Sequence, residues 1–100
     1  MASYRFLGTM MEIPDLSMLV QRFGEKVELD KDVAENAVLI GAQMIPEDQF
    51  SALGFTDKEL EENASSAAHD SAPDEFKKKK FKALTALHDF RQTVRAEKGV

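Results

Sequence analysis

The chain has 100 residues, of which 43% are hydrophobic and 31% charged, with a net charge of −5 and no cysteine. This composition is that of one small globular domain, or of a small domain with an appendage. The lack of cysteine excludes disulfides, thiolate zinc ligands and a cysteine nucleophile. No apolar run approaches the roughly 20 residues of a membrane-spanning helix, so we expect no membrane contact.

The charge is distributed unevenly along the chain. Residues 1–75 hold five Lys or Arg against 16 Asp or Glu, a net charge of −11, whereas residues 76–100 hold eight against two, a net charge of +6. An acidic body followed by a basic terminal segment indicates an interaction appendage or head-to-tail self-contact. A solvated helix that is simply rich in lysine remains the alternative.

The first 23 residues predict a strand and then a helix. Residues 3–13 alternate in part between apolar and polar, and Gly8 interrupts the pattern, so we expect one strand with a bulge or bend at this glycine. Between residues 15 and 23 the apolar side chains recur at the spacing of one helical face. A helix is therefore favoured there over a strand.

A strand and a helix are predicted to follow. Residues 25–29 alternate with period two, which predicts a strand with Val27 and Leu29 facing inward. Residues 30–40 carry a broad apolar face, and their early acids suit the positive end of a helix. Residues 42–45 are expected to be a short extended piece.

Two more short helices are indicated next. Residues 46–53 favour a helix with Pro46 at its first position, where a missing N–H costs nothing. Thr56 and Glu59 have the spacing of a capping box, in which the threonine caps the helix and the glutamate reaches back. A helix is therefore predicted to begin at Asp57.

The rest of the chain predicts a linker and a long helix. Residues 63–73 hold no large apolar side chain to offset the entropy of ordering. Residues 74–98 begin with acids and end with bases, as a helix dipole favours. The predicted class is α+β, with a small acidic domain over residues 1–62, two or three short strands, three short helices, a linker over residues 63–73 and a basic amphipathic helix over residues 74–98.

The predicted terminal helix carries an apolar seam. Its members recur at steps of seven, four, three and four residues, with Lys80 at the missing step; they are Phe76, Ala83, Leu87, Phe90 and Val94. Such a seam packs either on its own domain or on a partner, and the spacing leaves both open. We take partner contact as the working hypothesis, with apolar anchors that supply most of the energy and a charged rim that steers. The expected partner-binding residues are Phe76, Lys77, Lys78, Lys79, Lys80, Leu87, Phe90, Arg91, Val94 and Arg95.

The basic cluster over residues 77–82 includes Phe81 as an aromatic that looks exposed. Phosphate neutralisation needs such charge, but the acidic body opposes non-specific binding to a polyanion and no base-reading motif is present. Nucleic acid is therefore not the expected partner. An acidic protein surface and a merely solvated helix face are the two interpretations that remain.

No catalytic, metal-binding or cofactor-binding constellation is recognisable. His69 and His88 each stand beside an aspartate, but without a spaced ligand set they do not predict a zinc site. The serines lack a supporting nucleophile motif, and the glycines are dispersed rather than gathered in a phosphate loop. We therefore expect a non-enzymatic protein with no cofactor.

Several short segments resemble small proteins of tailed bacteriophages. They are Y-R-F-L-G at residues 4–8, F-G-E-K-V-E-L at 23–29, Ala34, G-A-Q-M-I-P at 41–46, and Phe50 followed by G-F-T at 54–56. The resemblance covers residues 4–60 and carries over no functional residue. It implies a non-enzymatic virion component of the minor capsid, decoration or head–tail type, present in the virion or the host cytoplasm. Its partner would then be the major capsid protein, a neighbouring virion protein or further copies of itself.

Two other functions remain open. A small acidic protein of this kind also fits an inhibitor or regulator that occludes a host protein. The charge layout is likewise similar to that of capsid scaffolding proteins, in which an acidic chain ends in a basic helix that docks on the coat protein. Scaffolding proteins are, however, usually longer and more helical than this chain.

Overall fold

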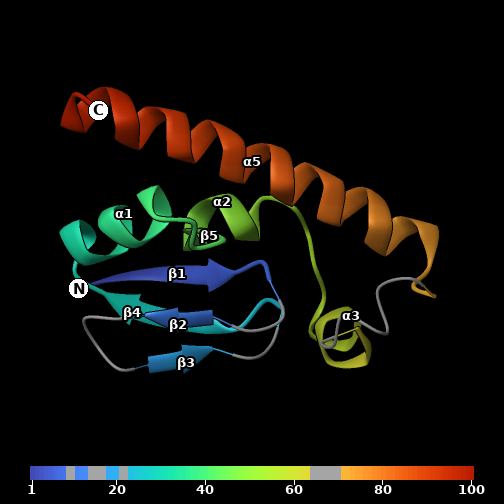
Figure 1. Ribbon diagram of the computed structural model, residues 1–100. Helices are drawn as coiled ribbons and strands as arrows, with labels where there is room; N and C mark the ends of the chain where they lie inside the picture. Colours follow the sequence, from blue (N-terminus) through green and yellow to red (C-terminus); the bar gives the residue numbers. More distant parts are fainter. Residues whose placement is uncertain (9–10, 14–17, 21–22, 64–70) are drawn as a thin grey trace.

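The computed structural model describes residues 1–8, 11–13, 18–20, 23–63 and 71–100 (Figure 1). Its elements in chain order are β1 (Ala2–Phe6), β2 (Met11–Ile13), β3 (Met18–Val20), β4 (Lys26–Leu29), α1 (Lys31–Leu39), β5 (Met44–Pro46), α2 (Glu47–Ser51), α3 (Asp57–Glu62) and α5 (Asp74–Lys98). The predicted α+β class is confirmed, because a small antiparallel sheet is combined with helices that include one long C-terminal helix.

The main sheet has three strands in the order β4-β1-β5, with β1 in the centre. Both neighbours run antiparallel to β1, so that Tyr4 lies opposite Val27 on one side and Pro46 on the other. Along β1, Tyr4 and Phe6 are buried, whereas the intervening Arg5 is half-buried. This alternation follows from the period of two along a strand.

Two predictions for the first 23 residues are wrong. The single bent strand over residues 3–13 is in fact two strands, since β1 belongs to the main sheet while β2 pairs with β3 in a separate two-stranded sheet. The helix predicted over residues 15–23 is contradicted by β3, although residues 14–17 and 21–22 lie outside the described part. In so short a segment a few apolar residues fit either period, and pairing with β2 decides for the strand.

The later elements follow the sequence more closely. β4 is confirmed with Val27 and Leu29 buried, and α1 and β5 lie where a helix and an extended piece are predicted. Helix α2 begins one residue later than expected, because Pro46 is its N-cap and the last residue of β5. The capping box of α3 is present in full between Thr56 and Glu59. The bounds of the terminal helix are also confirmed.

Gly24 brings the sheet close to α3. Its backbone has a φ of +82°, and an added Cβ would lie 2.6 Å from a methyl group of Leu60. The Gly24 amide donates to the Phe6 carbonyl at 2.7 Å, and its own carbonyl accepts from Arg5 at 2.7 Å. Glycine is favoured here because the backbone is left-handed, and a Cβ would in addition require the Leu60 side chain to shift.

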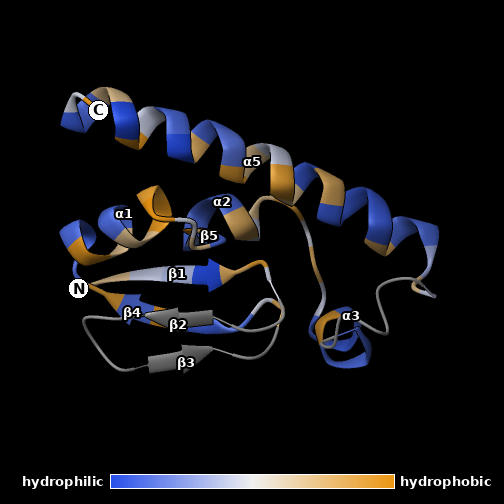
Figure 2. Ribbon diagram, viewed as in Figure 1, coloured by the Kyte–Doolittle hydropathy of each residue, from blue (hydrophilic) through white to orange (hydrophobic). Residues whose placement is uncertain are grey.

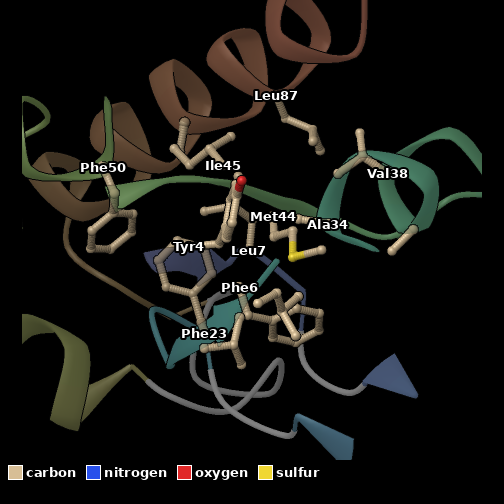
Figure 3. Packing of buried hydrophobic residues seen from close by; sticks show 14 of the residues in the cluster. Tyr4, Phe6, Leu7, Phe23, Ala34, Val38, Met44, Ile45, Phe50 and Leu87 are labelled. Carbon is tan, nitrogen blue, oxygen red and sulfur yellow. The ribbon is translucent and has the colours of Figure 1, made fainter. Parts of the chain in front are cut away.

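The hydrophobic core is one cluster shared by the sheet, the helices and α5 (Figure 3). Its fully buried large side chains are Phe6, Leu7, Phe23, Leu29, Val38, Met44, Ile45 and Phe76, and Val94 of α5 is fully buried outside this cluster. Helix α5 has 25 residues and is therefore about 37 Å long, close to the 39 Å long axis of the whole molecule. It runs across the side formed by α1, α2 and β5 (Figure 1).

An aromatic cluster ties the N-terminal half of α5 to the rest of the chain. The ring of Phe76 lies 5.5 Å from the rings of Phe23 and Phe55, centre to centre. Phe55 in turn stacks on Phe50 at 5.0 Å. Such edge-on and stacked pairs add stability beyond the area they bury. Phe76 thus packs directly on rings from two other segments of its own chain, and Phe50 backs one of them.

The expectation that the seam of α5 contacts a partner is corrected by this packing. Phe76, Leu87 and Val94 are only 1%, 4% and 0% exposed, and Phe90 packs on the core with its ring 6.4 Å from that of Tyr4. Figure 2 shows the apolar and hydrophilic residues alternating along α5. Three of the four expected anchors are therefore buried and Phe90 packs against the core half-buried, since a short sheet alone does not cover its apolar side chains.

Candidate protein-docking face

Lys79 binds the N-terminal half of α5 to α3 and to the turn before it. Its Nζ lies 2.7 Å from the Glu59 carboxylate and donates to the Gly54 carbonyl at 3.0 Å. Glu59 also accepts from the backbone amide of Thr56 at 3.0 Å. The hydrogen bond from Lys79, followed by the one from Thr56, lowers the pKa of Glu59.

Arg5 binds β1 to α2 through a similar ion pair. It donates to the Glu47 carboxylate, with one guanidinium nitrogen at 3.1 Å, and its guanidinium lies 5.2 Å from the centre of the Phe50 ring. This hydrogen bond lowers the pKa of Glu47, and burial opposes the shift without reversing it.

Both shifts predict a loss of stability in acid. A carboxylate whose pKa is lowered by folding stabilises the native state above its unfolded pKa, here 4.5, and that contribution is lost as the pH falls through the folded pKa. The melting temperature should therefore be steady from about pH 7 to about pH 5.5 and then fall as both carboxylates gain protons. Thermal unfolding is followed by circular dichroism from neutral pH down through the pH at which the two carboxylates gain protons.

Matched glutamine variants assign the effect to its residue. Glu59→Gln should melt lower than the parent at neutral pH and show a shallower fall in acid, whereas Glu62→Gln, which alters an exposed carboxylate on the same helix, should follow the parent curve. An identical acid profile for Glu59→Gln and the parent would contradict the role assigned to Lys79.

The C-terminal half of α5 is held on α1. Arg91 donates to the carbonyls of Val38, in the last turn of α1, and Ala42, just after it, at 3.1 and 3.3 Å. Near the end of α5, Lys98 lies 3.8 Å from the carboxylate of Glu35, a buried residue of α1. Lys79 and Lys98 are thus the α5 cations for which the structure gives an ion pair with the acidic body.

One side of α5 takes no part in this internal pairing, and we call it the outer face: Lys77, Lys78, Phe81 and Lys82. Phe81 is 71% exposed, and with the three lysines and Asp74 it lines a shallow depression. Among the described residues, none forms an ion pair with these three lysines. Leu84, one turn further on, is 40% exposed and extends the apolar surface.

The outer face suits a surface that offers both an apolar side chain and carboxylates. Lysine stems are apolar along their length and can line the contact around Phe81 while their charged ends stay in water. Fully burying a phenylalanine side chain is worth about 1.5–3 kcal/mol. The surrounding ammonium groups would meet acidic groups of the partner and set the orientation of docking.

The ten expected partner-binding residues are thus divided by the structure. Phe76, Leu87 and Val94 are buried, and Phe90 packs half-buried against the core. Two hold α5 on its own chain, namely Lys79 and Arg91. Lys80 is half-buried, and Arg95 is exposed near the C-terminal end of the helix. Only Lys77 and Lys78 lie on the outer face, together with Phe81 and Lys82, which were not among the ten.

The described residues do not support a metal site or a membrane-spanning helix. Within them, no cluster of three or more metal-ligating side chains occurs, and none of their helices is long and apolar enough to cross a membrane. His88 is exposed on α5, as expected for a helix-surface residue, whereas His69 lies outside the described part.

The structure defines a small α+β protein whose basic C-terminal helix completes the core. Comparison with known proteins adds no relative to this description: no family model matches the chain, and no match was found among curated proteins or solved structures.

Proposed function

We propose that this chain is a non-enzymatic structural or adaptor protein that docks through the outer face of α5 onto an acidic protein surface. The observation that carries the proposal is Phe81, a large aromatic side chain that is 71% exposed within a group of lysines. The neighbouring aromatic of the same helix, Phe76, is 1% exposed. The chain thus buries one aromatic of α5 and leaves the next one in water, beside charges that it does not itself neutralise.

The size of this face favours a role in an assembly. One aromatic anchor contributes about 1.5–3 kcal/mol, and each exposed ion pair adds about 0.2–1 kcal/mol. A single contact of this strength binds weakly, but copies that bind side by side gain from effective concentration. An inhibitor that acts as one copy on one target would need a larger contact.

An acidic protein is favoured over nucleic acid as the partner. Residues 1–75 carry a net charge of −11, which repels a polyanion as it approaches the molecule. A protein partner instead offers local carboxylates and an apolar contact for Phe81. We propose a tailed-phage virion as the setting, and the resemblance of residues 4–60 to small phage proteins is what supports it.

A peptide titration tests the docking face. The probe is a helical peptide with leucines along one side flanked by glutamates, added to the ¹⁵N-labelled protein. We expect the amide signals of residues 77–84 to shift, and Phe81→Ser to weaken binding about tenfold, the equivalent of about 1.4 kcal/mol. Val100→Ser is the matched control, because Val100 is 76% exposed but lies at the other end of α5.

Two further binding experiments can overturn the proposal. A peptide with glutamine in place of every glutamate should bind more weakly than the acidic probe; equal binding would remove the electrostatic part. A DNA duplex should bind more weakly than the acidic peptide. Tighter binding of DNA, with a steep salt dependence, would replace the protein partner by a nucleic acid.

A further inference from the structure

Helix α3 is too short to be stable by itself. It has six residues, none of which is buried, and isolated helices shorter than about 12–15 residues are marginal in water. Glu61 and Glu62 lie in its last turn, where no basic residue accompanies them and where the helix dipole disfavours negative charge. Figure 1 shows α3 apart from α1 and α2, at the end of the molecule where α5 begins. The structure of α3 therefore depends on its contacts with the rest of the chain.

One carboxylate oxygen both starts α3 and joins it to α5. Oε1 of Glu59 accepts from the backbone amide and the hydroxyl of Thr56, at 3.0 and 3.2 Å, which forms the start of the helix. The same oxygen accepts from Nζ of Lys79 at 2.7 Å. A hydrogen bond between charged groups of this kind is roughly twice as strong as one between neutral groups. Docking on Lys79 and forming the first turn of α3 therefore support each other.

Leu60 provides the apolar part of the docking of α3. It packs, half-buried, against the core cluster. One of its methyl groups would lie 2.6 Å from a Cβ added to Gly24, so the leucine lies directly over this glycine. With Phe23 and Gly24 it lines a depression where α3 meets the sheet. Glu59 thus joins α3 to α5, and Leu60 joins it to the sheet side of the core.

The chain is fixed to the core just before α3 and again after it. Phe55 stacks on Phe50 at 5.0 Å, and its ring lies 5.5 Å from that of Phe76. Ala72 is 7% exposed and belongs to the core cluster. Helix α3 itself adds only the half-buried Leu60 to that cluster. The sheet and α5 can therefore keep their packing when α3 leaves its place.

We propose that α3 is a latch that folds only while it is docked and opens by itself, while the sheet and α5 stay folded. Opening breaks the bond between Glu59 and Lys79, unwinds α3 and uncovers Phe23 and Gly24 beside the aromatic cluster. This device goes beyond the docking role of the outer face. Lys79 and Phe81 are two residues apart, and thus about 200° apart around α5, so each can be changed without the other.

Hydrogen exchange at increasing urea concentration tests for the separate opening. The amides of Leu60 and Asn63 donate to the carbonyls of Thr56 and Glu59, both at 3.1 Å, so they are protected while α3 is formed. We expect them to exchange about 100-fold or more faster than the amides of β1, at a rate that urea does not change, since a local opening exposes little surface. Exchange of both amides at the rate of β1, with the same increase in urea, would overturn the latch.

A double variant tests whether docking forms the helix. Lys79→Gln with Leu60→Ser removes both contacts, so the Cα chemical shifts of residues 57–62 should become those of an unfolded peptide, while those of β1 and of the C-terminal half of α5 stay unchanged. Lys58→Gln with Val100→Ser is the matched control, because these side chains are 83% and 76% exposed, and it should keep α3 helical.

Two results of the double variant contradict the latch. Helical shifts that persist over residues 57–62 would mean that α3 forms without docking. Loss of structure in β1 together with α3 would mean that α3 belongs to the same cooperative unit as the sheet.

Discussion

Leu87→Asp is expected to unfold the whole protein. Leu87 is 4% exposed and points from α5 toward the core near Val38 (Figure 3). Removing a buried leucine side chain costs about 2–5 kcal/mol, and an unpaired charge in its place adds several kcal/mol. Together these losses match the roughly 5–15 kcal/mol that stabilises a typical domain. Circular dichroism should show loss of structure in the strands as well as in α5.

Phe81→Asp is the matched control on the same helix. Because Phe81 is 71% exposed, its replacement should change the free energy of unfolding by about 0.5 kcal/mol or less. If Leu87→Asp instead left a folded body and freed only α5, the helix would not be part of the core, and the packing of its seam within the chain would be contradicted.

Phe76→Ala should lower the free energy of unfolding by about 3–5 kcal/mol, the usual cost of deleting a buried aromatic side chain. Phe76 is 1% exposed and contacts the rings of Phe23 and Phe55, so the truncation leaves a cavity between three segments. Urea unfolding of the parent and the variant measures the difference, with the slope of the transition expected to stay unchanged.

Phe81→Ala gives the comparison for this truncation as well, with an expected loss of about 0.5 kcal/mol or less. A Phe76→Ala loss as small as that of Phe81→Ala would mean that the aromatic cluster does not hold α5 in place.

The sequence predicted the fold best where a local signal was strong. Thr56 and Glu59 formed a capping box because that interaction needs only residues of one turn. The strand with Val27 and Leu29 was predictable because its alternation was clean. The segment over residues 15–23 failed because its apolar spacing suits a helix, while pairing between β2 and β3, a tertiary effect, decided the outcome.

The candidate site was harder to predict for a related reason. The seam of Phe76, Leu87 and Val94 is recognisable from spacing, but spacing does not say whether its partner is the same chain or another. That depends on how much of the sheet needs covering, which only the packed structure shows. The signal for the outer face was present in Phe81, an aromatic residue that falls between the seam positions and is flanked by lysines.

Hydrogen exchange of the isolated chain tests the central claim most directly, namely that α5 buries its seam in its own core and leaves the outer face exposed. If the claim holds, amides of α5 between Phe76 and Val94 exchange as slowly as those of β1, through the same global opening and at every protein concentration. Amides of α5 that exchange at the rate of an unfolded peptide while β1 stays protected would contradict it.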